Sequence, residues 1–338
     1  MYTENPKINN QFSLWLITMF WMVSIMIVVG GLTRLTDSGL SITKWELFSG
    51  SLPPLNQNDW LLYFNLYKEI PEFKLQNFDM SLSEFKIIFW WEWFHRFLGR
   101  VIGLGFLIPL IYFSFKIRFR RLLNLYFIFF LICLQGFIGW YMVSSGLVER
   151  VDVSHFRLSL HLMIAFLILS LIQWNYLEIR KKNNLSNPLN PILPIIFLFL
   201  VFLQISIGAF VSGMDAGKIY NSWPLMGDTY FPNDNNFRNL FKLSVFSDPS
   251  LVQFIHRNIA YLIGLFYLLI FYKVYSNKLF ELYKSINILG LTIILQIILG
   301  IFTVIYGAQI YIASLHQISS IILVSSCVYF LHINTNFN

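Results

Sequence analysis

Charge and cysteine are both scarce in this chain. Only 12% of its 338 residues are charged, whereas 57% are hydrophobic and 18% aromatic, and the mean hydropathy is +0.62. A soluble domain of this length needs more polar surface, so the composition excludes a soluble protein. The two cysteines, Cys133 and Cys327, stand inside apolar runs and are expected to behave as small hydrophobic residues. Neither a disulfide framework nor a zinc-thiolate site is expected.

What the chain does have is a series of long apolar runs. Crossing about 30 Å of hydrocarbon takes roughly 20 helical residues, and each run is uniformly apolar, where the strands of a barrel would alternate. The sequence therefore predicts an all-α membrane protein with eight transmembrane helices. The predicted spans are 14–33, 95–115, 122–143, 157–177, 192–212, 254–272, 286–306 and 312–333.

The few charges are unevenly distributed along the chain. Basic residues gather at the N-terminus and in the short loops after every second span, whereas the longer loops carry an acidic excess. The positive-inside rule then predicts cytoplasmic termini and outward-facing long loops. This topology accounts for the net charge of +7, so no nucleic-acid partner is expected. The basic residues are Lys7, Lys116, Arg118, Arg120, Arg121, Arg180, Lys181, Lys182, Lys273, Lys278 and Lys284.

The first apolar run indicates where the protein is located. It is too long for a signal peptide and lacks a small-residue cleavage site, so we expect a retained span. About a dozen residues precede it, which leaves no room for a mitochondrial transit peptide. A bacterial cytoplasmic (inner) membrane is therefore the expected location.

Two distant stretches begin alike. EWFHRFLGRVIGL at 92–104 and QFIHRNIAYLIGL at 253–265 both place His-Arg at the head of an apolar run. The glutamine and glycine of 135–139 recur in 296–300 with the same offset. Matched polar residues within apolar sequence indicate an internal repeat.

A second match joins the ends of the first and fifth runs. GGLTRLTDSGLSITKW at 30–45 aligns with GAFVSGMDAGKIYNSW at 208–223. We therefore predict two pseudo-symmetric four-helix bundles, an N-terminal half at 1–182 and a C-terminal half at 183–338. Because each half holds an even number of spans, the repeats are expected to be parallel, related by an axis along the membrane normal.

Four of the six histidines stand at the outer ends of spans. His95 and His161 come from the second and fourth spans of the N-terminal half, and His256 and His316 from those of the C-terminal half. Two imidazoles at similar depth in a helical bundle suit a planar haem gripped from both sides. Zinc fits less well, because no cysteine and few suitably spaced carboxylates accompany the histidines.

One ligand assignment is ambiguous. At the offset of the repeat it is His155, expected in a loop, that matches His316. His161 is preferred because Arg157 lies one turn before it on the same helical face. The sixth histidine, His332, stands at the cytoplasmic end of the last run and has no predicted role.

Arginines accompany the candidate ligands. Arg96 and Arg257 directly follow a histidine, and Arg157 precedes one. Arginine pairs well with carboxylates, so these residues are candidates for the haem propionates. The alternative is that they extend to lipid headgroups.

The two halves differ three residues before the first ligand. Glu92 precedes His95, whereas Gln253 precedes His256. A carboxyl group beside a haem can exchange protons and an amide cannot, which indicates one reactive half and one structural or electron-relaying half. The alternative for Glu92 is an exposed interfacial carboxylate. A capping box formed by Ser81 and Glu84 predicts that this helix begins well before its apolar run.

These stretches resemble the heme A synthase family, particularly its mitochondrial and alphaproteobacterial branch. The matching stretches run through most of the chain and together are highly specific. They are GGLTRLTDSGLSITKW, PEFKLQNFDMSLSEFK, EWFHRFLGRVIGL, QGFIGWYMVSSGL, VSHFRLSLHL, VSGMDAGKIYNSWPLMG and QFIHR. Some bacterial branches carry a cysteine pair in an outer loop, and this chain has none there, so a thiol-based step is excluded.

The resemblance implies an eight-helix oxidoreductase that converts the C8 methyl of haem O to the formyl of haem A for cytochrome oxidase assembly. It implies haem b on His256 and His316, and the haem O substrate on His95 and His161. Glu92 would be tied to catalysis. Implied partners are a haem O synthase, cytochrome oxidase assembly factors and an unidentified electron partner.

Other classes of function remain open. A diheme b-type cytochrome that only transfers electrons explains the four histidines but not the difference between Glu92 and Gln253. A carrier built on parallel repeats predicts helices broken in mid-membrane, whereas the polar residues here cluster at the outer ends. A haem chaperone without chemistry is a third alternative.

Overall fold

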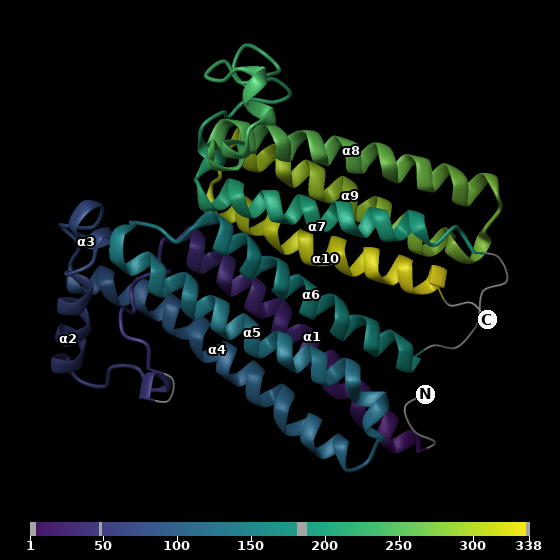
Figure 1. Cartoon of the computed structure of the whole chain (residues 1–338), viewed down its shortest axis with the longest axis horizontal. Helices are drawn as coiled ribbons and strands as arrows, with labels where there is room; N and C mark the ends of the chain where they lie inside the picture. Colours follow the sequence, from purple (N-terminus) through teal and green to yellow (C-terminus); the bar gives the residue numbers. More distant parts are fainter. Residues whose placement is uncertain (1–4, 47–48, 181–187, 336–338) are drawn as a thin grey trace. The chain divides into compact units, whose positions relative to one another are not determined.

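The computed structural model describes residues 5–46, 49–180 and 188–335. Within these ranges the regular structure is helical, without a β-strand, and eight helices are long and apolar enough to cross a membrane (Figure 1). They are α1 (Pro6–Leu35), α4 (Leu82–Ser114), α5 (Phe119–Glu149), α6 (His155–Arg180), α7 (Ile192–Gly213), α8 (Pro249–Ser276), α9 (Phe280–Ile305) and α10 (Ile310–Thr335). The prediction of a multi-pass, all-α membrane protein is confirmed.

The helices extend beyond the predicted spans, because helix ends depend on capping and not on apolarity. At α4 the Ser81 side chain accepts from the Glu84 backbone N–H at 3.3 Å, and Glu84 accepts from the Ser81 N–H at 2.8 Å. This confirms the predicted capping box. Since a helix rises 1.5 Å per residue, α4 continues for about 20 Å on the N-terminal side of His95.

The expectation that His155 lies in a loop is wrong. His155 is the first residue of α6, it is 9% exposed, and its ring lies 4.2 Å from that of Phe156. The helix begins here because the Ser154 carbonyl accepts from the Leu158 N–H at 2.9 Å. The intervening stretch contains no proline or glycine that would end the helix earlier.

The chain divides into two compact units, each described by itself. The small unit comprises residues 21–165 and the large unit comprises residues 1–20 with 166–338. The predicted boundary between 182 and 183, together with Lys181 and Lys182, falls outside the described residues. The division into halves, their pseudo-symmetry and their parallel orientation stay predictions.

In the large unit four helices form a bundle. Helix α7 packs against α8 and α10, and α9 packs against the same two helices, so the four enclose a common interior. The α7–α8 connection is irregular, with short helices η2 (Ala216–Lys218), η3 (Phe237–Phe241) and η4 (Leu243–Ser247). Side chains supply its order: Tyr220 and Ser250 both donate to Asp234, at 2.9 and 2.5 Å.

In the small unit α4 packs against α5, and the α1–α4 connection folds onto the beginning of α4. This connection contains η1 (Ser49–Ser51), α2 (Gln57–Tyr67) and α3 (Pro71–Leu75). Its aromatic rings pack on those of α4: Trp60 lies 5.0 Å from Phe89. Burial of such rings supplies most of the stabilisation of a small apolar cluster.

The first connections of the two units start with the same backbone bend. Asp37 after α1 and Asp215 after α7, which are aligned in the sequence, have φ of 47° and 53°. Aspartate is one of the few residues that adopt this left-handed conformation readily, because its short side chain can bond locally. The bend directs each connection back over the end of its own unit's helices.

Candidate functional site

Each of the four candidate ligands in the described helices is faced by a glycine of the preceding helix. In the large unit a Cβ added at Gly208 would lie 3.0 Å from His256 Cε1, and one at Gly300 would lie 3.0 Å from His316 Cε1. Such distances are shorter than ordinary carbon contacts. Only glycine therefore lets α7 and α9 approach the imidazoles this closely.

The small unit has the same arrangement. A Cβ at Gly30 would lie 3.1 Å from His95 Nε2, and one at Gly139 would lie 3.0 Å from His161 Cε1. It is His161, and not His155, that receives the contact equivalent to that of His316. A glycine thus closely approaches each candidate ligand, although His95 presents its Nε2 to the glycine and the other three present Cε1.

Within each unit the two histidines lie close together. His95 lies within electrostatic range of His161, and His256 lies within that range of His316. In three of them, His161, His256 and His316, the ring Nδ1 is buried without a hydrogen-bond partner. A buried polar atom without a partner is costly, and coordination to a metal removes that cost.

The donor set fits an iron porphyrin. Two neutral imidazoles from neighbouring helices are the usual axial ligands of a b-type haem. Among the described residues no group of three or more His, Cys, Asp or Glu side chains could hold a metal ion by itself, so a zinc site of the usual kind lacks its ligands. A macrocycle that supplies four further nitrogens needs no such group.

Three of these glycines are preceded, one turn earlier, by a glutamine. Each glutamine side chain donates a hydrogen bond to the backbone carbonyl of the histidine that the glycine faces. Gln135 Nε2 donates to the His161 carbonyl at 2.9 Å. Gln204 and Gln296 donate in the same way to the carbonyls of His256 and His316, at 3.0 and 3.1 Å. The sequence shows a glutamine and a glycine four residues apart in the matched runs, but it does not indicate that a backbone carbonyl is the target.

Glu92 is buried, with 2% of its surface exposed, and it is not an exposed interfacial carboxylate. Its Oε2 accepts from Ser41 Oγ at 2.7 Å and from the Ile42 N–H at 2.8 Å. Its Oε1 accepts from Arg96 Nε at 3.0 Å and Nη2 at 2.5 Å. The carboxylate therefore joins α4 to the beginning of the α1–α4 connection.

The matching amide in the large unit, Gln253, is a hydrogen-bond donor to its connection and not an acceptor. Gln253, also 2% exposed, donates its Nε2 to the Tyr220 carbonyl at 3.0 Å. Where Glu92 accepts hydrogen bonds from the connection, Gln253 gives one. A carboxylate at position 253 would face that carbonyl without a proton to donate.

The arginine after each first histidine binds backbone carbonyls. Arg96 Nη2 donates to the Ile42 carbonyl at 2.9 Å. Arg257 Nη1 donates to the carbonyls of Ser222 and Leu225 at 2.9 and 3.2 Å, and its Nη2 donates to that of Tyr220 at 3.0 Å. Arg257 Nε is buried without a partner. Both arginines thus hold the connection that precedes their helix.

Arg157 and His332 have other surroundings. The guanidinium of Arg157 donates to Ser145 Oγ and lies over the Tyr141 ring, 4.6 Å from its centroid. His332 is 3% exposed, and its Nε2 lies 3.0 Å from Glu178 Oε1. The contact with Glu178 explains why a histidine is buried at this end of α10, with no need for a haem or a metal ion.

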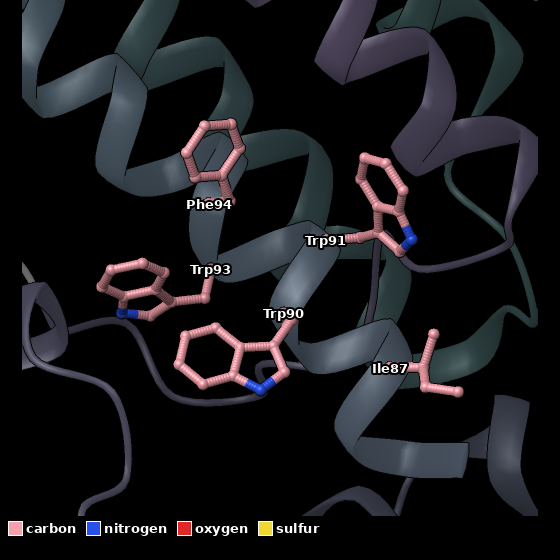
Figure 2. A pocket seen from close by; sticks show the side chains of 5 residues that line it. All are labelled: Ile87, Trp90, Trp91, Trp93 and Phe94. Atoms are coloured by element: carbon pink, nitrogen blue, oxygen red, sulfur yellow. The ribbon is translucent and has the colours of Figure 1, made fainter.

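An apolar hollow of about 530 Å³ lies on α4, on the turns that carry Glu92. Figure 2 shows its five side chains, Ile87, Trp90, Trp91, Trp93 and Phe94, spread around consecutive turns of the helix. Tryptophan gathers where a helix passes through the membrane–water boundary. Glu92 belongs to the same turns of α4 as these side chains.

Comparison with known proteins finds matches along nearly the whole chain. A family model described as "Cytochrome oxidase assembly protein" matches residues 13–328. The heme A synthase of Pelagibacter ubique is 50% identical over 99% of this chain and all of its own. Those of Rickettsia bellii and Flavobacterium psychrophilum are 42% and 41% identical, covering 93% and 96% of this chain and 96% and 98% of their own. Because the family model covers nearly the whole chain, and relatives at 41–50% identity cover it as fully, the protein belongs to the COX15-CtaA family of cytochrome oxidase assembly proteins.

Proposed function

We propose that this protein is a heme A synthase, an oxidoreductase that converts the C8 methyl of haem O to the formyl of haem A. The observation that carries the proposal is the pair of histidines in each unit, each approached closely by a glycine, with a buried carboxylate beside one pair and a buried amide beside the other. The names of the relatives support the same activity.

The two pairs take different roles in this proposal. His256 and His316 hold a haem b cofactor in the large unit, and His95 and His161 receive haem O in the small unit. The cofactor supplies electron transfer when bound. The unpaired Nδ1 atoms of His161, His256 and His316, and the glycine that approaches each of the four histidines, support these ligand sets.

Glu92 handles protons during oxidation of the substrate methyl. With water as the oxygen source, the methyl is oxidised to an alcohol and then to a geminal diol, and the diol loses one water to leave the aldehyde. Each oxidation consumes one water and releases two protons and two electrons, and the electrons pass to the electron partner. Of the four donors on Glu92, the Ser41 hydroxyl alone can rotate away without moving backbone or a charged group. We assign proton acceptance to Oε2, which bonds Ser41, and positioning to Oε1, which bonds Arg96.

Arg157, Arg96 and Arg257 supply positive charge for the propionates. In Arg257 the loop carbonyls take three of the five N–H donors, so the buried Nε–H and one Nη2–H are left for a carboxylate. Apolar surfaces of the spans receive the farnesyl chain of haem O. The α1–α4 and α7–α8 connections cover the ends of the two sites.

The membrane placement follows from the charges at the helix ends. Lys116 and Arg118 lie between α4 and α5, and Lys273 and Lys278 lie at the end of α8. We infer that these ends and both termini face the cytoplasm of a bacterium and that the long connections face outward across the inner membrane. A haem O synthase, cytochrome oxidase assembly factors and an electron partner complete the pathway.

The test is to express the full chain with a haem O synthase and to identify the extracted haems by mass. Wild type yields haem A, whereas Glu92→Gln yields haem O with the low-spin haem b spectrum unchanged. Glu69→Gln, which alters a carboxylate 79% exposed in the same unit, serves as the matched control and yields haem A. If wild type also leaves only haem O beside an intact haem b spectrum, the protein is an electron-transferring diheme cytochrome.

A further inference from the structure

The four glycines that face the candidate ligands differ in the residue one turn before them. Three of the positions are glutamine and one is methionine. In chain order the residues are Met26 before Gly30, Gln135 before Gly139, Gln204 before Gly208 and Gln296 before Gly300. The exception stands opposite His95.

Each glutamine fixes the helix that carries its histidine. A carbonyl has two acceptor sites, so a histidine carbonyl within a helix can accept from a side chain as well as from its own helix. The bonds of Gln135, Gln204 and Gln296 therefore lock three ligand helices against their neighbours, at 2.9 to 3.1 Å. Gln204 and Gln296 also lie 3.3 and 3.5 Å from the ring Nε2 of their histidines.

Met26 occupies the corresponding place without making such a bond. A Cβ at Gly99, one turn after His95, would lie 3.4 Å from the Met26 methyl group. The methionine side chain thus reaches the same part of the ligand helix that the glutamines reach elsewhere. It has no N–H to donate, and its thioether is flexible and apolar.

We propose that Gln135, Gln204 and Gln296 are positioning residues for three ligands, and that His95, which faces Met26, is the ligand that releases during exchange of the substrate haem. This rests on the proposed function, in which one haem stays and the other enters as haem O and leaves as haem A. Both ligands of the resident haem are fixed. In the exchanging site His161 keeps its fixed orientation while His95 moves.

The direct test installs the missing bond. Full-length Met26→Gln, purified with both haems, is mixed with excess apomyoglobin, and the loss of haem from each site is followed by absorption. One hydrogen bond corresponds to about a fivefold change in rate, so loss of the small-unit haem slows about fivefold. Met22→Gln, the same change one turn away on α1, leaves the rate unchanged.

The converse variant tests the positioning residues in the large unit. Gln204→Met speeds loss of the resident haem about fivefold and alters its low-spin spectrum, while the small-unit haem leaves at the wild-type rate. Equal rates for Met26→Gln and Met22→Gln, or a Gln204→Met protein that keeps its haem as wild type does, overturn the proposal.

The composition of the extracted haems reports the proposed function separately. If the rates change as expected but wild type makes no haem A, His95 is still the labile ligand of an exchangeable haem. Only the proposed heme A synthase activity is then refuted. If haem A forms normally but the rates do not respond, the positioning role fails alone. Should Met26→Gln not fold, the Gln204→Met rate still decides the outcome.

Discussion

Replacing Gly139 by alanine should remove haem from the small unit. The new Cβ would stand 3.0 Å from His161 Cε1, whereas carbon atoms in contact prefer about 3.5–4.0 Å. The imidazole must therefore move by roughly 0.5–1 Å, and a ligand constellation tolerates only about 0.5 Å. Overpacking of this kind costs about 1–3 kcal/mol, which outweighs the gain of about 1 kcal/mol from replacing a glycine within a helix.

Gly136, on the same helix, provides the matched control. Nothing lies within 4 Å of a Cβ added there, so Gly136→Ala keeps only the gain in helix propensity. We expect Gly139→Ala to lose small-unit haem in a pyridine haemochrome assay and to keep the low-spin spectrum of the large unit. Gly136→Ala should retain both haems and unfold at an equal or higher temperature.

The corresponding pair in the large unit reverses the result. Gly300→Ala places a Cβ 3.0 Å from His316 Cε1, whereas the nearest atom to one at Gly264 is 4.0 Å away. Gly300→Ala should therefore lose the low-spin haem b spectrum while Gly264→Ala keeps it. If Gly139→Ala and Gly300→Ala bind both haems as fully as their controls, the glycine contacts do not mark ligand sites.

Three further results are expected. His256→Ala should abolish the low-spin haem b spectrum while His95→Ala leaves it, and the same spectrum in both would contradict the cofactor assignment. Burial raises the pKa of Glu72 to about 8 from 4.5, and the hydrogen bond from Tyr67 opposes this shift. The folded state is therefore destabilised as pH rises from about 4.5 to 8. Hydrogen exchange in α2 and α3 should accelerate over that range beyond the intrinsic pH effect, and Glu72→Gln should show no such acceleration. His332→Ala should lower stability by about 1–3 kcal/mol in thermal unfolding and leave haem content unchanged, whereas loss of haem would assign it a ligand role.

Hydropathy was sufficient to predict the spans because lipid demands uniformly apolar helices of a fixed minimum length. It could not predict where the helices end, since α4 and α6 continue into regions where capping and packing decide. Ser81 with Glu84 was recognisable because a capping box has a sequence pattern. The start of α6 at His155 had no such pattern, because its first bond comes from the Ser154 carbonyl.

Some features of the candidate site could likewise be predicted from the sequence and others could not. The histidine pairs could be inferred from repeated spacing, and the special position of Glu92 from the contrast with Gln253. The carbonyl groups that Arg96, Arg257 and the glutamines bind could not be predicted. Every residue has a carbonyl, so the identity of the acceptor leaves no trace in the sequence.

The grip of Arg257 on three carbonyl oxygens has a consequence for how this surface can change. Tyr220, Ser222 and Leu225 contribute to the grip through their main chain and not through their side chains. Tyr220 and Ser222 are also held by their side chains, through Asp234 and the Gly227 N–H. Leu225, whose side chain cannot form a hydrogen bond, can vary as long as the backbone keeps its course. The guanidinium has no such freedom, because a lysine ammonium cannot span three acceptors with a rigid fork.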